Sequence, residues 1–340
     1  MTLLYMIGGL LGLILMGLPI AVALAIVATA AIVIYQGVDM LPNVGLTMFE
    51  GASSFPLLAI PMFVLAGAIM NTGGISKRLI AFASALFGFI RGGLAMINIG
   101  VSLFFAEISG SAVADVAATG SVLIPAMKKR GYPSSFAAAV TSSSASLAII
   151  IPPSIPMILY GVMSGASIVQ LFVAGIVPGL LGAAGLAGLS YYYARKYNWP
   201  VEEVFQFKRV KQTAREAGWA LTLPIIILGS IFGGFVTATE GAGLAVAAAI
   251  FISAVIYREL DMRTLYKAII DGGQQTAVVM LLVAASALIG VFLTEMRTPQ
   301  QLAQAVLSLT ENKYVILMIL NVFFLLIGLF LHSAAAIILV

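Results

Sequence analysis

Residues Thr141–Pro156 read TSSSASLAIIIPPSIP, and they lie inside an apolar block that runs from 134 to 164. A double proline removes two backbone donors and disfavours helical backbone at the residue before it. A helix that crosses this block must therefore break near its middle, a few residues after a run of hydroxyl side chains. The stretch predicts a discontinuous helix with uncharged polar groups at mid-depth. The plainer alternative is a proline kink whose hydroxyls bond back to their own helix.

The chain around this stretch is apolar throughout. Its 340 residues are 61% hydrophobic and only 9% charged, where a soluble globular chain has about 25% charged residues. Continuous apolar blocks exclude a closed β-barrel, whose strands alternate apolar and polar residues, and the absence of cysteine excludes a disulfide-rich scaffold. We therefore predict an all-α polytopic membrane protein. Its apolar blocks fall at 3–18, 20–35, 54–71, 93–108, 112–127, 134–164, 168–193, 219–236, 241–257, 272–294 and 314–340.

Basic residues gather in small clusters between the apolar blocks, and they predict which loops face the cytoplasm. The stretch 92–127 has such clusters on both sides, so it must leave the cytoplasm and return to it. Two full spans would need about 40 residues, and the middle of the stretch, Glu107–Asp115, is polar and contains glycine. We therefore predict a re-entrant hairpin over 93–127 with its tip at Ser109–Ser111. The basic clusters are Lys77/Arg78/Arg91, Lys128/Lys129/Arg130, Arg195/Lys196 with Lys208/Arg209/Lys211/Arg215, and Arg258/Arg263/Lys267.

A hairpin tip beside a broken helix is typical of an ion-coupled carrier, where half-helix ends and unwound carbonyls hold cations. Two other classes of membrane protein fit less well. A channel would need a continuous hydrophilic face, which only the two interrupted blocks could offer. An intramembrane enzyme would need a base beside the serines, and no His or Lys is expected there because Lys128 and Lys129 lie at the membrane interface. His332 is the only histidine in the sequence. One histidine also makes no metal site, although at a hairpin tip it could sense protons.

The chain matches itself weakly at an offset of 222 to 223 residues, as in the pair Asn98 and Asn321. Counting the spans between the copies predicts that the second copy crosses the membrane in the opposite sense, which is an inverted repeat. The linkers 75–91 and 297–312 then become surface arms on opposite faces. The offset places a second hairpin tip near His332, so we expect the C-terminal part of the second repeat to be missing from this chain and the protein to have about 420 residues.

Four stretches, in the same order, resemble the large membrane (M) subunit of the tripartite ATP-independent periplasmic (TRAP) transporters. The resemblance covers most of the chain and implies an inverted-repeat, elevator-type fold in which hairpins and broken helices slide against a scaffold. The stretches are Ser54–Phe63 with Met70–Ile75, Ser109–Asp115, Ile151–Pro156 and Gly233–Glu240.

This resemblance implies a function as well as a fold. It implies sodium-coupled uptake of an organic acid, such as a C4-dicarboxylate or sialic acid, across the bacterial inner membrane. The expected partners are a small four-helix membrane subunit and a periplasmic substrate-binding protein, with Na⁺ as coupling ion, no other cofactor and no enzymatic activity. The alternative is a sodium- or proton-coupled carrier of the related divalent-anion/sodium symporter type, which works without a binding protein.

The resemblance also divides the chain. Scaffold spans and the first arm helix occupy 1–92, and the first hairpin with the broken helix occupies 93–165 as the transport domain. Scaffold spans follow over 166–271, with a basic cytoplasmic loop at 194–218. A span and the second arm helix occupy 272–312, and 313–340 begin the second hairpin.

Site residues follow from the same motifs. Sodium, a hard cation, prefers oxygen ligands, and hydroxyls with freed carbonyls supply them without a buried charge. His332 stands where members of the family commonly have an acidic residue. The expected sodium-binding residues are Ser109, Gly110, Ser111, Ser142, Ser143, Ser144, Pro152, Ser154, His332 and Ser333. The expected substrate-binding residues are Ser111, Asp115, Ser146, Pro153 and Ser154.

Three acidic residues lie where helices are expected to begin or end. Asp115 follows the hairpin tip, where the positive end of the helix dipole stabilises a carboxylate. It is expected either to stabilise this helix end or to take part directly in the binding site. Glu107 precedes the tip and is expected to cap or pair. Glu240 follows Thr237 and is expected to start a helix.

Overall fold

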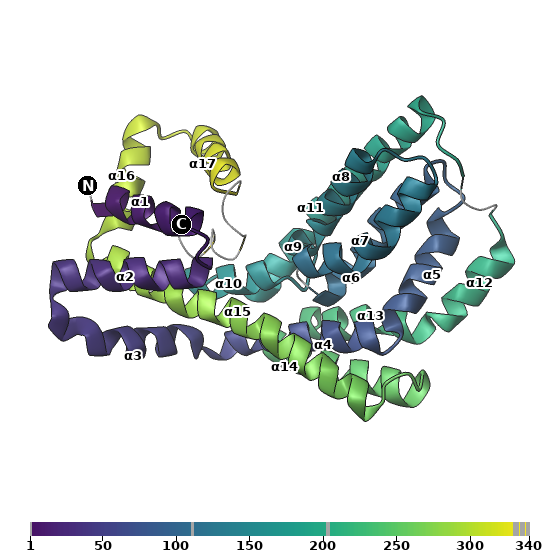
Figure 1. Cartoon of the computed structure of the whole chain (residues 1–340), viewed down its shortest axis with the longest axis horizontal. Helices are drawn as coiled ribbons and strands as arrows, with labels where there is room; N and C mark the ends of the chain where they lie inside the picture. The colour runs from purple at the N-terminus through teal and green to yellow at the C-terminus, as the bar shows by residue number, and fades with distance from the viewer. Residues whose placement is uncertain (1, 110–111, 202–204, 329–332, 334–336, 338–340) are drawn as a thin grey trace. The chain divides into compact units, whose positions relative to one another are not determined.

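The computed structural model describes the chain except for residues 1, 110–111, 202–204, 329–332, 334–336 and 338–340. Within these limits every regular element is a helix, and no strand is found (Figure 1). Several of the helices are strongly apolar. The prediction of an all-α chain is therefore confirmed, and its apolar helices agree with a polytopic membrane protein, while the elevator and re-entrant details stay predictions.

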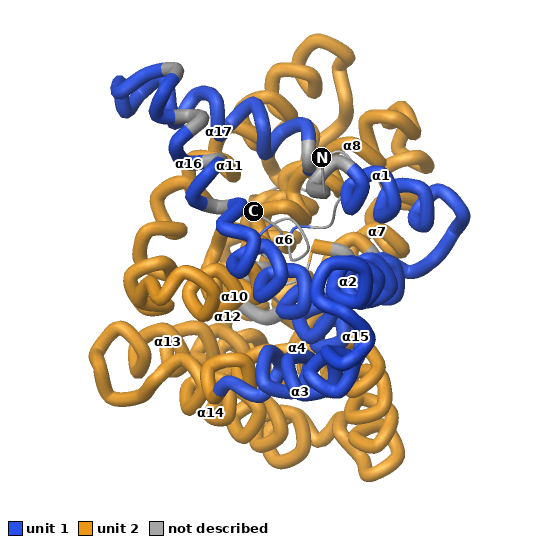
Figure 2. Tube along the Cα trace, turned by 90° about the vertical axis from the view of Figure 1, so that its left-hand side faces the viewer, with its two compact units in different colours: residues 1–54, 276–340 blue, residues 55–275 orange. Residues whose placement is uncertain are grey.

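Two compact units divide the chain: residues 1–54 with 276–340, and residues 55–275 (Figure 2). In the first unit, the paired helices α1 and α2 are followed by a short 3₁₀ turn and α3. The sequence analysis did not predict α3, because polar residues such as Asn43 and Glu50 interrupt the apolar pattern by which the other helices were predicted. The described elements are α1 Thr2–Leu15, α2 Ile20–Gln36, η1 Val38–Met40, α3 Leu41–Ala52, the second part of α15 Met262–Glu295, α16 Thr298–Leu309 and α17 Lys313–Gly328.

The second unit contains both interrupted blocks. Its core forms where α5, α6, α7, α8, α9 and α11 pack side by side, around buried residues such as Val101, Met127 and Leu147. The elements are η2 Phe55–Leu58, α4 Ala59–Thr72, α5 Ile75–Phe87, α6 Gly93–Ser109, α7 Ala112–Lys129, α8 Ser134–Ala145, α9 Leu147–Ile150, α10 Ile155–Ser164, α11 Ile168–Lys196, α12 Phe207–Glu216, α13 Gly218–Phe232, α14 Ala238–Phe251, the π-helix η3 Ile252–Ile256 and the first part of α15.

Four helical segments among the described residues are long and apolar enough to cross a membrane, and two bent helix pairs raise this number to six. One bent pair joins α8 and α9 to α10 at 40°, and the other joins α12 to α13 at 60°. The first pair is the break predicted at the double proline. The four single segments are Phe55–Thr72, Ile168–Lys196, Ala238–Ile256 and Met262–Glu295.

The segment 194–218, expected to be a basic cytoplasmic loop between spans, contains helix over part of its length. The end of α11 and the whole of α12 lie in it. Lysine, arginine, glutamine and alanine all favour helix, so a basic composition indicates the side of the membrane and not the backbone conformation. Similarly, α15 begins ten residues before the apolar block at 272, because Asp261 accepts from the backbone N–H of Thr264 at 2.8 Å and caps the helix.

The internal repeat is visible in the order of helices. Adding 223 to the bounds of α5 gives 298–310, and α16 occupies 298–309. The same shift carries α6 onto 316–332, where α17 occupies 313–328. The opposite sense of the two copies and the second hairpin tip stay predictions, since His332 lies outside the described residues.

Candidate functional site

The helix break lies at Ile151–Ser154, between α9 and α10. Ile151 is extended, with φ −83° and ψ 130°, as expected for a residue before proline. The Pro152–Pro153 peptide bond is cis. Ser154 then caps α10, because its hydroxyl accepts from the backbone N–H of Met157 at 3.4 Å. The sequence alone thus predicted the place where the helix stops and restarts.

The backbone carbonyls next to the break are less accessible to a bound ion than the sequence suggests. The Ile149 carbonyl accepts from the Ser154 hydroxyl at 2.5 Å. The Ile150 carbonyl lies against Gly175 of α11, where a Cβ would collide with it, and the Ile151 side chain lies against Gly179 in the same way. The break is therefore packed directly on a glycine face of α11. The two glycines thus allow close packing of the broken helix on α11.

A buried, uncharged hydrogen-bond network connects α6 with α8. Asn98 Nδ2 donates to Thr141 Oγ1 at 2.6 Å, and Ser102 Oγ donates to Ser144 Oγ at 3.0 Å. Ser144 Oγ also lies 3.3 Å from Asn98 Oδ1. All four side chains have no exposed surface. The first helix of the predicted hairpin, α6, is thus joined by polar contacts to the first half of the broken helix.

Sequence reasoning did not select Asn98 or Ser102, although a signal was present. They are four residues apart, and Thr141 and Ser144 are three apart, so each pair lies on one helix face. Two polar side chains on one face of an otherwise apolar helix predict a buried polar partner.

Asp115 adds the one carboxylate of this region that the structure describes. It lies in the first turn of α7, is 0% exposed, and neither carboxylate oxygen has a hydrogen-bond partner among the described residues. Ser102 is the polar side chain that faces it, but the Ser102 hydroxyl donates to Ser144. Thr119 donates to the Asp115 main-chain carbonyl at 2.8 Å. A buried carboxylate without a partner is costly, so this position would stabilise a cation or a proton.

The predicted serine cluster does not act as one group. Ser144 faces inward, whereas Ser142, Ser143 and Ser146 are exposed on the other side of α8. The Ser142 hydroxyl donates to the Ala139 carbonyl at 3.1 Å, and the Ser146 hydroxyl donates to the Ser143 carbonyl at 2.6 Å. This back-bonding is the plainer alternative considered for these hydroxyls.

Of the remaining predicted site residues, some lie in the part of the chain that the structure describes and others do not. Pro152, Pro153 and Ser154 are buried at the break. Ser109 ends α6, but its side chain, together with Gly110, Ser111 and His332, lies outside the described part. Ser333 is half-buried with helical backbone and belongs to the other compact unit, so its relation to the hairpin stays a prediction.

The expectation for Glu240 is confirmed. Thr237 Oγ1 accepts from the Glu240 backbone N–H at 3.3 Å, and the Glu240 carboxylate accepts from the Thr237 backbone N–H at 2.8 Å. This reciprocal capping box starts α14. The Glu107 side chain lies outside the described part, and its role stays a prediction.

No group of three or more His, Asp or Glu side chains gathers within the described residues. The polar atoms that meet between α6, α7 and α8 are hydroxyls, one amide and the Asp115 carboxylate. Such a set of oxygens suits a hard monovalent cation better than a transition metal, which favours imidazole or thiolate ligands.

Comparison with known proteins connects this site to a family. The family described as "Tripartite ATP-independent periplasmic transporter, DctM component" matches residues 7–340. The chain is 41% identical over 323 residues to an isethionate TRAP transporter permease protein of Oleidesulfovibrio alaskensis, covering 95% of the chain and 51% of that protein. It is 38% identical over 328 residues to the 2,3-diketo-L-gulonate TRAP transporter large permease protein of Escherichia coli, covering 96% of the chain and 77% of that protein.

A third relative is the C4-dicarboxylate TRAP transporter large permease protein of Pseudomonas aeruginosa. The identity is 37% over 299 residues, which cover 88% of the chain and 70% of that protein. The chain therefore spans about half the length of the first relative and between two thirds and four fifths of the other two.

Proposed function

The chain belongs to the DctM family of TRAP transporter large permeases, and from this premise we propose that it forms the membrane pathway of a sodium-coupled carrier for an organic anion. The observation that carries the proposal is the buried set of oxygens between α6, α7 and α8, beside a broken helix. The relatives are named as transporter permeases, which are not enzymes.

The sodium site of this proposal lies where the hairpin meets the broken helix. Ser144 supplies a buried hydroxyl next to Asn98 and Ser102, and Asp115 supplies a buried carboxylate that no cation among the described side chains neutralises. The predicted tip residues Ser109–Ser111 would complete the coordination from the hairpin. A bound cation would offset the cost of keeping the Asp115 carboxylate away from water. We therefore expect Asp115 to contribute strongly to the binding energy of the sodium ion.

The substrate of the proposed carrier is an organic anion, such as a C4-dicarboxylate or sialic acid. The three relatives are named for isethionate, 2,3-diketo-L-gulonate and C4-dicarboxylates, which are all organic anions. A sodium ion bound near Asp115 lowers the cost of bringing a second negative charge to the middle of the membrane. Sodium and substrate would then bind cooperatively, which is the basis of symport.

The proposal includes an elevator movement, the bacterial inner membrane and two partners. The partners are a small four-helix membrane subunit and a periplasmic substrate-binding protein, as the family's tripartite name suggests. The hydrogen bonds from α6 to α8 support a movement in which the hairpin and the broken helix travel together, because separating them would leave Asn98 and Thr141 unpaired in a region without water.

Uptake by reconstituted vesicles tests the proposal. The complete transporter, with small subunit and binding protein, is placed in proteoliposomes with an imposed sodium gradient and a radiolabelled organic anion. We expect uptake that follows the sodium gradient and requires the binding protein. Uptake that ignores sodium contradicts the coupling, and equal uptake without the binding protein would favour a carrier of the divalent-anion/sodium symporter type.

A further inference from the structure

Helix α12 differs from the spans around it, because four of its ten residues are basic. These are Lys208, Arg209, Lys211 and Arg215, and Glu216 is the only acidic residue in the helix. The helix follows α11 and precedes α13, which are both strongly apolar. A short basic helix between apolar helices is positioned to meet the membrane surface.

Three of these basic residues form a stripe along one face of α12. Lys208, Lys211 and Arg215 are three and four residues apart, so they lie within about 60° of one another around the helix axis. All three are exposed, whereas Val210 and Thr213 are half-buried on the opposite side, where α12 packs on α5. Within the part of the chain that the structure describes, no acidic side chain forms an ion pair with the stripe.

Exposed aromatic side chains flank the stripe. Phe207, in the first turn of α12, is 71% exposed, and Trp219, in the first turn of α13, is 53% exposed. Just before the helix, the Phe205 ring contacts Phe89 edge-on at 4.9 Å, which holds the start of α12 against the α5–α6 connection. Aromatic residues of this kind concentrate where a protein crosses from hydrocarbon to the headgroup layer.

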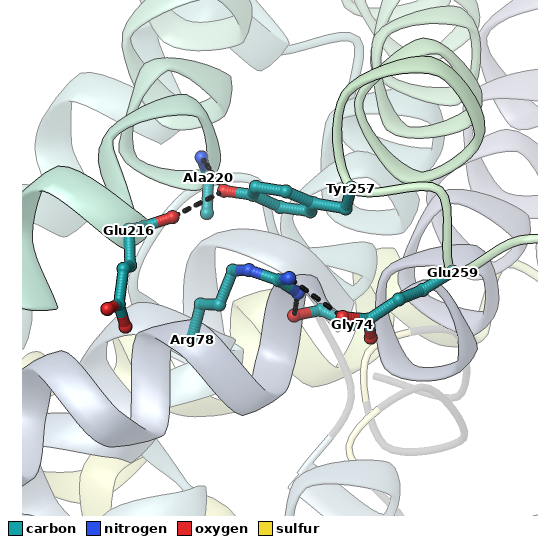
Figure 3. A network of polar contacts seen from close by, with 6 residues as sticks. All are labelled: Gly74, Arg78, Glu216, Ala220, Tyr257 and Glu259. Atoms are coloured by element: carbon teal, nitrogen blue, oxygen red, sulfur yellow. Dashed lines mark hydrogen bonds and ion pairs between the residues drawn. The ribbon is translucent and has the colours of Figure 1, made fainter.

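The angle of α12 is held by a network around Tyr257 (Figure 3). The Tyr257 hydroxyl donates to the Glu216 carbonyl and accepts from the Ala220 backbone N–H, both at 3.1 Å, so it bridges the bend between α12 and α13. The Arg78 guanidinium lies 3.8 Å from the centre of the Tyr257 ring and pairs with Glu259 at 2.7 Å. The two helices are bent by 60°, so α12 does not continue in the direction of α13.

We propose that Lys208, Lys211 and Arg215 form a binding surface for the phosphate groups of anionic phospholipids. Charge complementarity selects this partner, since three exposed cations on one helix face match the negative surface of the cytoplasmic leaflet. The flanking aromatics insert at headgroup depth, and the Tyr257 network keeps α12 bent away from α13 so that the stripe faces the headgroups. The surface lies on the side of the membrane that the basic clusters predict to be cytoplasmic.

Native mass spectrometry of the purified full chain in mild detergent tests this surface, with a short-chain phosphatidylglycerol as ligand and phosphatidylcholine as comparison. In the variant Lys208→Gln/Lys211→Gln/Arg215→Gln, we expect phosphatidylglycerol affinity to fall roughly 100-fold, at about fivefold for each basic side chain lost. Phosphatidylcholine binding should not change, and Lys208→Arg/Lys211→Arg should bind phosphatidylglycerol as the parent does.

The matched control is Arg91→Gln/Lys128→Gln/Lys129→Gln, which removes the same charge from three exposed positions outside α12. It should keep phosphatidylglycerol affinity within about threefold of the parent. An equal loss in both triple variants, or no loss in the stripe variant, would overturn the proposal. So would parent binding that does not distinguish phosphatidylglycerol from phosphatidylcholine, because a stripe that recognises an acidic protein instead would show that result.

Discussion

Replacing Gly175 by alanine tests whether the broken helix depends on its contact with α11. A Cβ at this position would collide with the Ile150 carbonyl, which is backbone and cannot rotate away, and would lie 2.5 Å from Met157 Cε. Overpacking of this kind costs about 1–3 kcal/mol, and the rigid carbonyl places Gly175 at the upper end of that range. The higher helix propensity of alanine stabilises the fold by up to about 1 kcal/mol relative to glycine. The net expectation is a loss of about 2 kcal/mol of folding free energy.

Gly185 provides a matched control on the same helix, because a Cβ there would meet nothing within 4 Å. Gly185→Ala should therefore gain up to about 1 kcal/mol, which separates the two variants by about 3 kcal/mol. Thermal unfolding in mild detergent, followed by near-ultraviolet circular dichroism, should show a midpoint lower by roughly 6 °C or more for Gly175→Ala than for Gly185→Ala. Equal midpoints for the two variants would refute the close contact between the break and α11.

Three further predictions follow from the site and from the Arg78 network. Asp115→Asn should weaken the apparent sodium affinity of transport at least about tenfold, because it removes the carboxylate that a cation would neutralise; Asp39→Asn, which removes an exposed carboxylate, should leave that affinity unchanged in the same uptake assay. Asn98→Leu should cost about 2–3 kcal/mol in thermal unfolding, since two buried hydrogen bonds are lost, and an unchanged midpoint would contradict the network. The hydrogen bond from Arg78 holds the pKa of Glu259 below its ordinary value of 4.5, so the pair stabilises the fold above that pH and the contribution is lost as pH falls through the lowered pKa. Glu259→Gln should flatten this part of the stability profile below about pH 4.5, and a parent-like profile in the variant would assign the acid sensitivity to other groups.

Local chemistry explains which features could be predicted from the sequence. The break at Pro152–Pro153 is a consequence of missing donors and steric exclusion, and neither depends on the rest of the fold. The capping box at Thr237 and Glu240 is equally local, because both partners lie within one turn. In contrast, α3 and α12 were not predicted as helices, since a search for apolar blocks does not detect polar and basic residues that also favour helix.

The candidate site was only partly predictable for a different reason. The serines between 142 and 146 predict that this segment carries hydroxyl groups. Because successive residues point in different directions around a helix axis, the sequence does not show which of these hydroxyls face a neighbouring helix. Contact with α6 decides that Ser144 is buried with Asn98 while Ser142, Ser143 and Ser146 remain exposed. Sequence spacing on one helix cannot specify the rotation of that helix against a neighbour.

The sequence by itself determined that the chain is helical and apolar enough to span a membrane. It also determined the position at which one helix breaks and the family to which the chain belongs. These properties depend on composition, on neighbouring residues and on the order of motifs. Only the tertiary structure decided that Asn98, Ser102 and Ser144 meet, that the Asp115 carboxylate is buried next to Ser102, and that Tyr257 fixes the angle of α12. The physical reason is that these contacts join residues dozens of positions apart, so they exist only once the packing of whole helices brings the side chains together.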